Sequence, residues 1–240
     1  MTTTRIRKIA ATLIALTLVG GIAASVPAEA ATTATRYVTV NSEGSIKVTP
    51  DAVRLNANVS VVAGSNKDAL AKTSTAATAV RAALTKAGIA KSDIATQSIS
   101  VYPEYNYTQD KGSVLVGYRG SQSFVVTIKN AENAGAVVDA VVAAGGDALQ
   151  IQGVTPFVLD SSSATESARA NAVKNAKAKA TSYAKLLGVK LGKVIYLDET
   201  STPTPFPIYS VAAKAEDSAT QIDLGEQKVT VSVTVRWSIG

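Results

Sequence analysis

Apolar and polar residues alternate in two long segments near opposite ends of the chain. In residues 53–61 and 229–237, every second residue is apolar, and the residues between them are mostly polar or charged. This period of two predicts strands with one buried and one solvated face, which is typical of antiparallel sheets. We expect the two strands to lie in one sheet. Residues 35–40 and 45–48 predict two shorter strands at the start of the same region.

The period changes to three and four residues in the segments that predict helices. Residues 65–87 carry such a pattern, with Ser65 able to cap the first turn and Gly88 able to take the left-handed conformation at the end. Residues 131–144 place valines on one face. We expect a helix in each segment, although the valines of the second would also suit a strand.

A third helix has the clearest local signals. Ser163 and Glu166 have the spacing of a capping box, alanines then recur at every fourth residue, and Gly188 can end the helix. An alanine row allows a helix axis to lie close to the layer that it covers. We therefore expect this helix to pack directly on a sheet.

The remaining patterns predict strands. Residues 96–107 and 114–129 predict a hairpin, residues 193–197 predict a short strand, and residues 148–159 predict a bulged or edge strand because Gly and Pro interrupt them. The order of elements predicts an α+β fold, in which about three helices lie on one side of a largely antiparallel sheet.

Residues 1–30 have the features of a cleavable signal peptide. Three basic residues precede an apolar run at 9–24, and the small-x-small sequence Ala28-Glu29-Ala30 follows it. The run is shorter than the roughly 18 residues of a spanning helix. We therefore expect export and a single domain at 31–240 without a stable membrane anchor. Cleavage removes three positive charges and one negative charge, which lowers the net charge from +6 to +4.

Composition limits the chemistry of the mature chain. It contains no Cys and no His, which excludes disulfides, thiolate nucleophiles, imidazole bases and the usual zinc sites. No glycine-rich phosphate loop follows a predicted strand, and we expect no cofactor. Direct scavenging of oxidants is also disfavoured, because the one Met is the first residue.

Several short motifs occur in one order along the mature chain. They lie at residues 40–45, 50–53, 87–89, 93–96, 102–105, 117–119 and 187–193, followed by a proline-rich segment at 201–207 and the last Val-Thr strand. In the sequences and order of these motifs, the chain resembles the SIMPL-domain family of exported bacterial proteins. It departs from the family at Asn41-Ser42, where a Gly usually precedes the Glu-Gly pair, and this difference is expected to affect a turn.

The resemblance implies a periplasmic or secreted protein. Some similar proteins assemble into large homo-oligomeric rings, some are surface antigens, and members have been linked to protection against oxidative stress. The resemblance supplies no catalytic residue.

Aromatic residues mark one candidate interaction surface. Half of the eight tyrosines lie in the predicted hairpin, at Tyr102, Tyr105, Tyr107 and Tyr118, and Phe206 lies in the proline-rich segment. Such side chains serve subunit contacts or sugar stacking, and they also suit cross-strand packing.

Lysines mark a second candidate surface on the third helix. Lys174, Lys177 and Lys185 belong to a basic stretch at 174–193 that could bind an anionic cell-envelope polymer, or could be a solvated helix face. We expect no nucleic-acid partner, because no set of stacking aromatics accompanies the lysines.

Enzyme activity is the third hypothesis. Ser182 and Lys185 match the S-x-x-K pattern of serine acyltransferases, but the companion motifs of that class are missing. Carboxylates near predicted loops, Asp110, Asp160, Asp198 and Glu199, are alternative candidates for a hydrolase site. The pattern favours a non-enzymatic protein of the periplasm, cell wall or medium that acts by self-association, with at most an indirect role in oxidative-stress defence.

Overall fold

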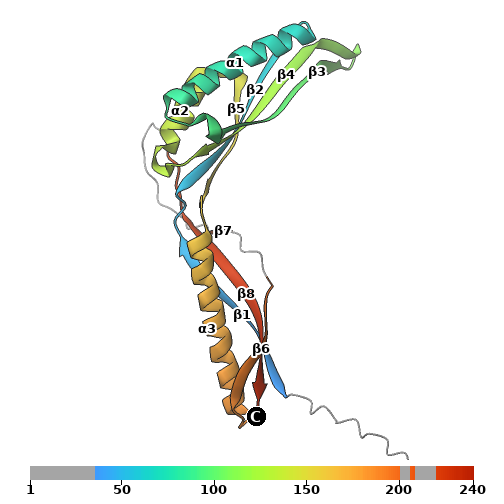
Figure 1. Ribbon diagram of the computed structural model, residues 1–240. Helices are drawn as coiled ribbons and strands as arrows, with labels where there is room; N and C mark the ends of the chain where they lie inside the picture. The colour runs from blue at the N-terminus through green and yellow to red at the C-terminus, as the bar shows by residue number, and fades with distance from the viewer. Residues whose placement is uncertain (1–35, 201–205, 209–219) are drawn as a thin grey trace, which may run out of the picture. The chain divides into compact units, whose positions relative to one another are not determined.

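The computed structural model describes residues 36–200, 206–208 and 220–240, and of 206–208 only the backbone. The described elements all belong to one unit, Thr35–Gly240 (Figure 1). The predicted signal peptide and most of the proline-rich segment lie outside the described residues.

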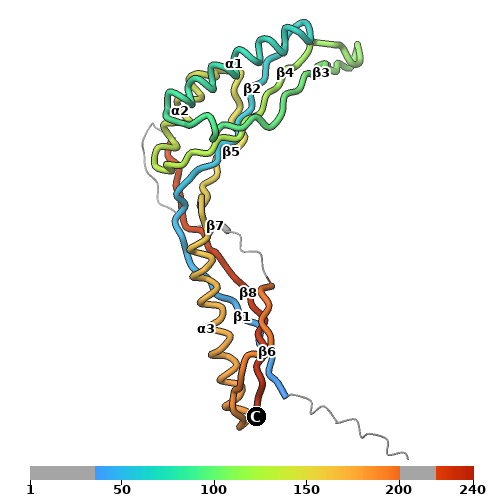
Figure 2. Tube along the Cα trace, viewed as in Figure 1, coloured from blue at the N-terminus to red at the C-terminus, as the bar shows by residue number. Residues whose placement is uncertain are grey.

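The first sheet contains the two ends of the described chain, and we call it the terminal sheet. Its strands are β1 (Tyr37–Val48), β6 (Leu191–Glu199), β7 (Phe206–Ile208) and β8 (Glu226–Ile239). The order is β1-β8-β6, β7 also pairs with β8, and all pairs are antiparallel. The helix α3 (Ser162–Leu186) runs along β1 and β8 (Figure 2).

The second sheet contains the middle of the chain, and we call it the central sheet. Its strands are β2 (Ala52–Ala63), β3 (Ile94–Thr108), β4 (Gly112–Ile128) and β5 (Leu149–Phe157). They are antiparallel in the order β3-β4-β2-β5. Two helices, α1 (Asn66–Lys86) and α2 (Ala134–Gly145), cover one face (Figure 1). Single turns of 3₁₀-helix lie at Lys91–Asp93, Ala131–Asn133 and Gly146–Ala148.

The predicted α+β class, with antiparallel pairing and three helices, is confirmed. The expectation that the strands at 53–61 and 229–237 share one sheet is wrong. The first pairs with β4 and β5, and the second pairs with β1. The predicted turn between residues 40 and 45 is also wrong, because β1 continues through Gly44 as one strand.

The local helix signals have mixed outcomes. The Ser65 cap is confirmed, because its Oγ accepts a hydrogen bond from the Asp68 backbone N–H at 3.1 Å. The capping box is wrong: α3 begins at Ser162, so Ser163 is already helical. Asp160 instead accepts the Ser162 backbone N–H at 2.8 Å. The prediction of a bulged edge strand is confirmed by β5.

Each sheet has its own apolar core. In the terminal sheet, alternate residues of β8 pack against the alanine row of α3, and all of them are buried; they are Val229, Val231, Val233, Val235, Trp237, Ala164, Ala168, Ala172, Ala176 and Ala180. In the central sheet, larger residues such as Leu55, Leu84 and Phe124 fill the space below α1 and α2. The alanine row therefore brings α3 closer to its sheet than bulkier side chains would allow.

The backbones of α3 and β1 lie close together at Gly44. A Cβ built on Gly44 would lie 2.0 Å from the Ala172 backbone nitrogen and 2.3 Å from the Ala168 carbonyl oxygen. Both atoms belong to the helix backbone and cannot move aside independently. Glycine at this position is thus a packing requirement, in the segment where the sequence departs from the family pattern.

Three polar side chains of α3 bind the outer edge of β1. Asn171, Asn175 and Lys179 each precede a row alanine by one residue. They donate hydrogen bonds to the carbonyl oxygens of Ser45, Glu43 and Asn41 at 3.2, 2.9 and 2.9 Å, respectively. Four helical residues rise about 6.0 Å and two strand residues about 6.6 Å, so the two repeats stay in step over these contacts. This row of donors closes the β1 edge to pairing with another strand.

Replacing Gly44 by Ala should destabilise the protein by about 3 kcal/mol, because α3 must shift away from β1 to admit a methyl group. Urea unfolding followed by circular dichroism measures this change. Gly64→Ala is the matched control, since a Cβ at Gly64 has open space around it. An equal effect of the two substitutions would contradict the packing requirement at Gly44.

Candidate functional site

The predicted hairpin of β3 and β4 carries a large exposed apolar surface. Three of the candidate tyrosines lie on β3 with exposed side chains, Tyr102, Tyr105 and Tyr107, the last of them 75% exposed. Tyr118 lies on β4 and is half-buried. Ile99, Val114, Leu115 and Val116 add exposed aliphatic side chains to the same two strands. Three of the four candidate tyrosines thus leave much of their surface exposed to solvent.

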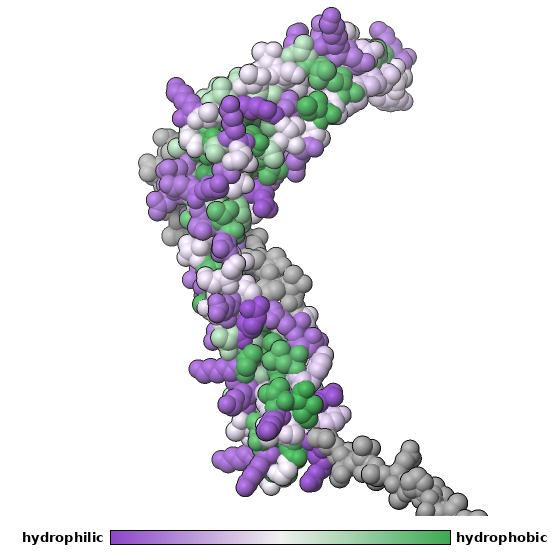
Figure 3. Space-filling view, in the orientation of Figure 1, coloured by the Kyte–Doolittle hydropathy of each residue, from purple (hydrophilic) through white to green (hydrophobic). Residues whose placement is uncertain are grey.

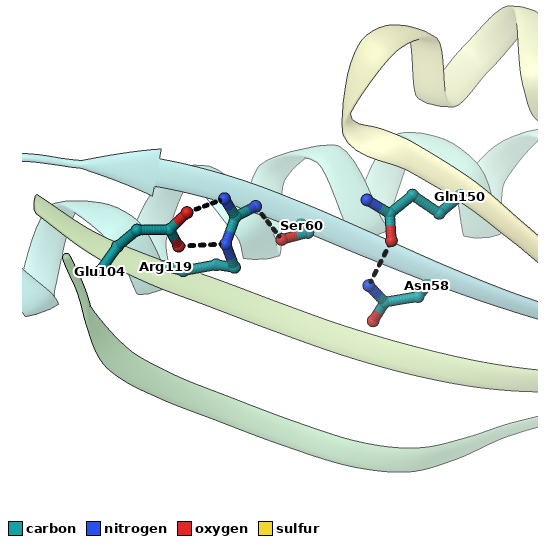
Figure 4. A network of polar contacts seen from close by, with 5 residues as sticks. All are labelled: Asn58, Ser60, Glu104, Arg119 and Gln150. Carbon is teal, nitrogen blue, oxygen red and sulfur yellow. Dashed lines mark hydrogen bonds and ion pairs between the residues drawn. The ribbon is translucent and has the colours of Figure 1, made fainter. Parts of the chain in front are cut away.

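An ion pair between β4 and β3 braces the hairpin (Figure 4). The Arg119 guanidinium donates two hydrogen bonds to the Glu104 carboxylate, and its third nitrogen donates to Ser60 Oγ on β2 at 3.1 Å. The hydrogen bond from Arg119 holds the pKa of Glu104 below its ordinary value, and the same contact raises the pKa of Arg119. A bidentate pair of this kind fixes the relative orientation of its two strands.

A row of hydrogen bonds crosses all four strands of the central sheet on the face opposite α1. Ser98 on β3 donates to Ser123 on β4 at 3.1 Å, and Ser123 donates to Asn58 on β2 at 3.2 Å. Asn58 donates in turn to Gln150 on β5 at 3.5 Å, as Figure 4 shows, and accepts a bond from Ser121 at 2.7 Å. This network holds β3 in register with the strands that carry the core.

The sequence pattern did not identify these residues as a network. The alternation in β2 places Asn58 on the solvated face, but its side chain is only 7% exposed, because the neighbouring polar side chains cover it. Glu104 and Arg119 lie within motifs of the family resemblance. Their pairing depends on the register of β3 with β4, which the sequence does not reveal.

The outer edge of β3 differs from that of β1. In the part of the chain that the structure describes, β3 pairs with β4 on one side. No helix side chain there is hydrogen-bonded to the backbone at its other edge, although Arg81 of α1 donates to Thr96 Oγ1 near the start of the strand. This edge belongs to a strand of 15 residues. Pro103 and the register shifts at residues 96–98 and 104–105 interrupt this edge, but the stretches between and beyond them still present backbone groups to which another chain can pair.

The structure separates the lysine candidates from the tyrosine hairpin. Lys174, Lys177 and Lys185 are exposed on α3, which packs on the terminal sheet. Phe206 begins β7 at the pairing position opposite Lys228, and its side chain lies outside the described atoms. The eight candidate residues thus do not converge on one site.

The enzymatic candidates are also dispersed. Ser182 and Lys185 are both exposed on α3, where neither side chain is enclosed in a pocket of the kind that a nucleophile and its base require. Glu199 is engaged by Arg169, with Nε to Oε2 at 2.7 Å, and Asp160 binds the start of α3. Within the described ranges, no three acidic side chains cluster where a metal ion could bind, and no helix is long and apolar enough to span a bilayer.

The fold and its surfaces define an α+β protein whose candidate site is a braced hairpin with an open strand edge. Residues 38–237 match the model of the SIMPL family, described as proteins of unknown function (DUF541). The chain therefore belongs to the SIMPL family, which confirms the resemblance seen in its sequence motifs.

Three relatives are similar to this chain over most of their length. The "26 kDa periplasmic immunogenic protein" of Brucella melitensis is 34% identical over 219 residues, which cover 87% of this chain and 86% of the relative. The protein of the same name from Brucella abortus gives the same values. "Uncharacterized protein YggE" of Edwardsiella ictaluri is 30% identical over 184 residues, or 76% of this chain and 75% of the relative.

Acid should weaken the ion pair between Glu104 and Arg119, which holds β3 against β4. Because the folded-state pKa of Glu104 is lowered, its stabilising contribution is complete above the unfolded value near 4.5 and is lost as the pH falls through the lower folded value. Urea unfolding in steps from neutral pH to well below 4.5 should therefore show a pH dependence that shrinks in Glu104→Gln.

Asp110→Asn is the control for this experiment, since Asp110 lies in the turn of the same hairpin. It should retain the pH dependence of the natural sequence. If Glu104→Gln retains it as well, the Arg119 contact does not lower the pKa of Glu104 in the folded protein.

Removing the Asn58 side chain should cost about 2 kcal/mol of unfolding free energy, because the hydroxyls that donate to it lose a buried acceptor. Chemical denaturation of Asn58→Ala measures the loss. Asn56→Ala, on the same face and strand, should change stability by less than about 0.5 kcal/mol. Equal losses would show that the polar row does not depend on Asn58.

Proposed function

We propose that this SIMPL-family protein acts in the periplasm as a non-enzymatic protein that self-associates through the outer edge of β3. Two relatives that bear the name of a periplasmic immunogenic protein support the location, and the predicted signal peptide agrees with it. The absence of Cys and His from the sequence supports a role based on surfaces, since it removes the commonest catalytic side chains.

The observation that carries the proposal is the contrast between the two outermost long strands. At β1, three side chains of α3 occupy successive backbone carbonyls. At β3, a longer strand presents its edge beside exposed tyrosines and aliphatic residues. A monomeric protein would be expected to protect such an edge as it protects β1.

The geometry favours pairing of the outer edge of β3 with a strand of a second copy. The Arg119–Glu104 pair and the polar row hold β3 extended and in register before any partner arrives. A preordered edge loses little conformational entropy when it pairs, and the exposed side chains of both copies would be buried together. A role in oxidative-stress defence would then be an indirect result of the assembly, since the mature chain lacks oxidisable sulfur groups.

Light scattering coupled to size-exclusion chromatography should give the mature chain, residues 31–240, a mass several times that of one chain. Tyr105→Lys should reduce this mass, because a charge beside the edge opposes burial against a second copy. Tyr183→Lys is the matched control, an exposed tyrosine on α3 that should leave the mass unchanged.

A natural chain that is strictly monomeric at micromolar concentration would refute the proposal. An assembly that Tyr183→Lys dissociates and Tyr105→Lys does not would keep self-association but move the interface from β3 to α3.

A further inference from the structure

The terminal sheet leaves one strand uncovered on the face where α3 packs. The helix lies over β1 and β8 and makes few contacts with β6. Val194 and Leu197 pair in register with Trp237 and Val235 of β8, so they lie on the same face of the sheet. Trp237 is 4% exposed beneath α3, whereas Val194 and Leu197 are 55% and 50% exposed.

The flank of α3 that borders β6 is identified by an ion pair. Arg169 follows the row alanine Ala168 by one residue and binds Glu199 of β6 through two hydrogen bonds, at 2.7 and 3.2 Å. Val173, Lys177 and Lys185 also follow row alanines by one residue. These residues therefore share the flank of Arg169, opposite the flank that binds β1.

Apolar and cationic side chains meet along this uncovered strip. We define the β6 strip by three exposed apolar residues: Val173 on the Arg169 flank of α3, and Val194 and Leu197 on β6. Figure 3 shows hydrophobic side chains gathered where Figure 1 places β6, with hydrophilic side chains around them. The lysines beside the strip are Lys177 and Lys185, on the same flank of α3, and both are exposed.

The carboxylates of β6 do not cancel this positive charge. Arg169 neutralises Glu199, and Arg169 lowers the pKa of that carboxyl, so Glu199 stays ionised and paired. Asp198 is in register with Thr234 and therefore lies on the opposite face of the sheet. The strip thus presents apolar groups within a net positive rim.

We propose that the β6 strip docks the protein reversibly onto the surface of an anionic phospholipid bilayer. Aliphatic side chains can enter the headgroup boundary while neighbouring lysines contact acidic lipids, and each component alone is too weak for stable binding. A purely anionic polymer would use the lysines and leave the apolar residues exposed to water. A second copy facing the same strip would bring like charges together, because a two-fold contact pairs a patch with itself.

This inference is independent of the proposed self-association, because the two surfaces belong to different sheets. The β6 strip lies on the terminal sheet, and the β3 edge lies on the central sheet. A protein that failed to self-associate could still bind lipid, and the reverse also holds.

Cosedimentation of the mature chain with vesicles tests the proposal. Vesicles of equal parts phosphatidylethanolamine and phosphatidylglycerol should bind the protein at least about tenfold more tightly than vesicles of phosphatidylcholine. Lys177→Gln should weaken binding about fivefold, and adding Lys185→Gln should weaken it by a similar factor again. Val194→Ser with Leu197→Ser should weaken binding about tenfold without a change in charge.

Matched controls lie on the helices that cover the central sheet. Lys67→Gln with Lys72→Gln removes two exposed lysines of α1, and Leu70→Ser with Val142→Ser removes two exposed apolar side chains of α1 and α2. Both double variants should bind vesicles as the natural chain does. Circular dichroism confirms that each variant folds.

Three outcomes would overturn the proposal. The first is equal binding to both vesicle types or to neither. The second is binding that depends on Lys177 and Lys185 but not on the apolar pair, which would indicate an anionic polymer surface. The third is a change in assembly mass in the strip variants without any vesicle binding, which would assign the strip to contact between copies.

Discussion

The close packing of α3 against β1 is the constraint on which the terminal sheet depends. Gly44 removes the side chain that would separate the helix from the strand, and the alanine row removes the side chains on the other side. The gain from such packing is many small contacts along the helix, since the buried face of α3 contributes a row of alanines. The helix is therefore held at one distance and in one register.

That register determines what each flank of α3 does. On one flank, Asn171, Asn175 and Lys179 reach the carbonyl oxygens of β1 and close the edge. On the other flank, Arg169 reaches Glu199 and leaves the rest of β6 uncovered. The same helix thus protects one strand and exposes another, and the exposed strand has both apolar and cationic neighbours.

In the central sheet, a different set of contacts keeps the exposed hairpin of β3 and β4 ordered. Larger core residues below α1 and α2 hold β2 and β4, and polar contacts on the opposite face extend that order to β3. Because these contacts are hydrogen bonds and an ion pair, they fix the register of the hairpin without covering its outer edge. An ordered strand with a free edge is suited to contact with another molecule.

The sequence alone determined the elements whose signals are local. The cap of α1 at Ser65, the left-handed glycines at its end and at the end of α3, the hairpin and the bulged edge strand all follow from side chains within a few residues. The family also followed from short motifs in order along the chain. Only the tertiary structure decided that there are two sheets, that β8 pairs with β1, and that Arg119 meets Glu104 and Arg169 meets Glu199. Alternation tells which residues of a strand share a face, but it does not tell which strand lies beside it, because the energy of pairing depends on contacts between residues far apart in sequence.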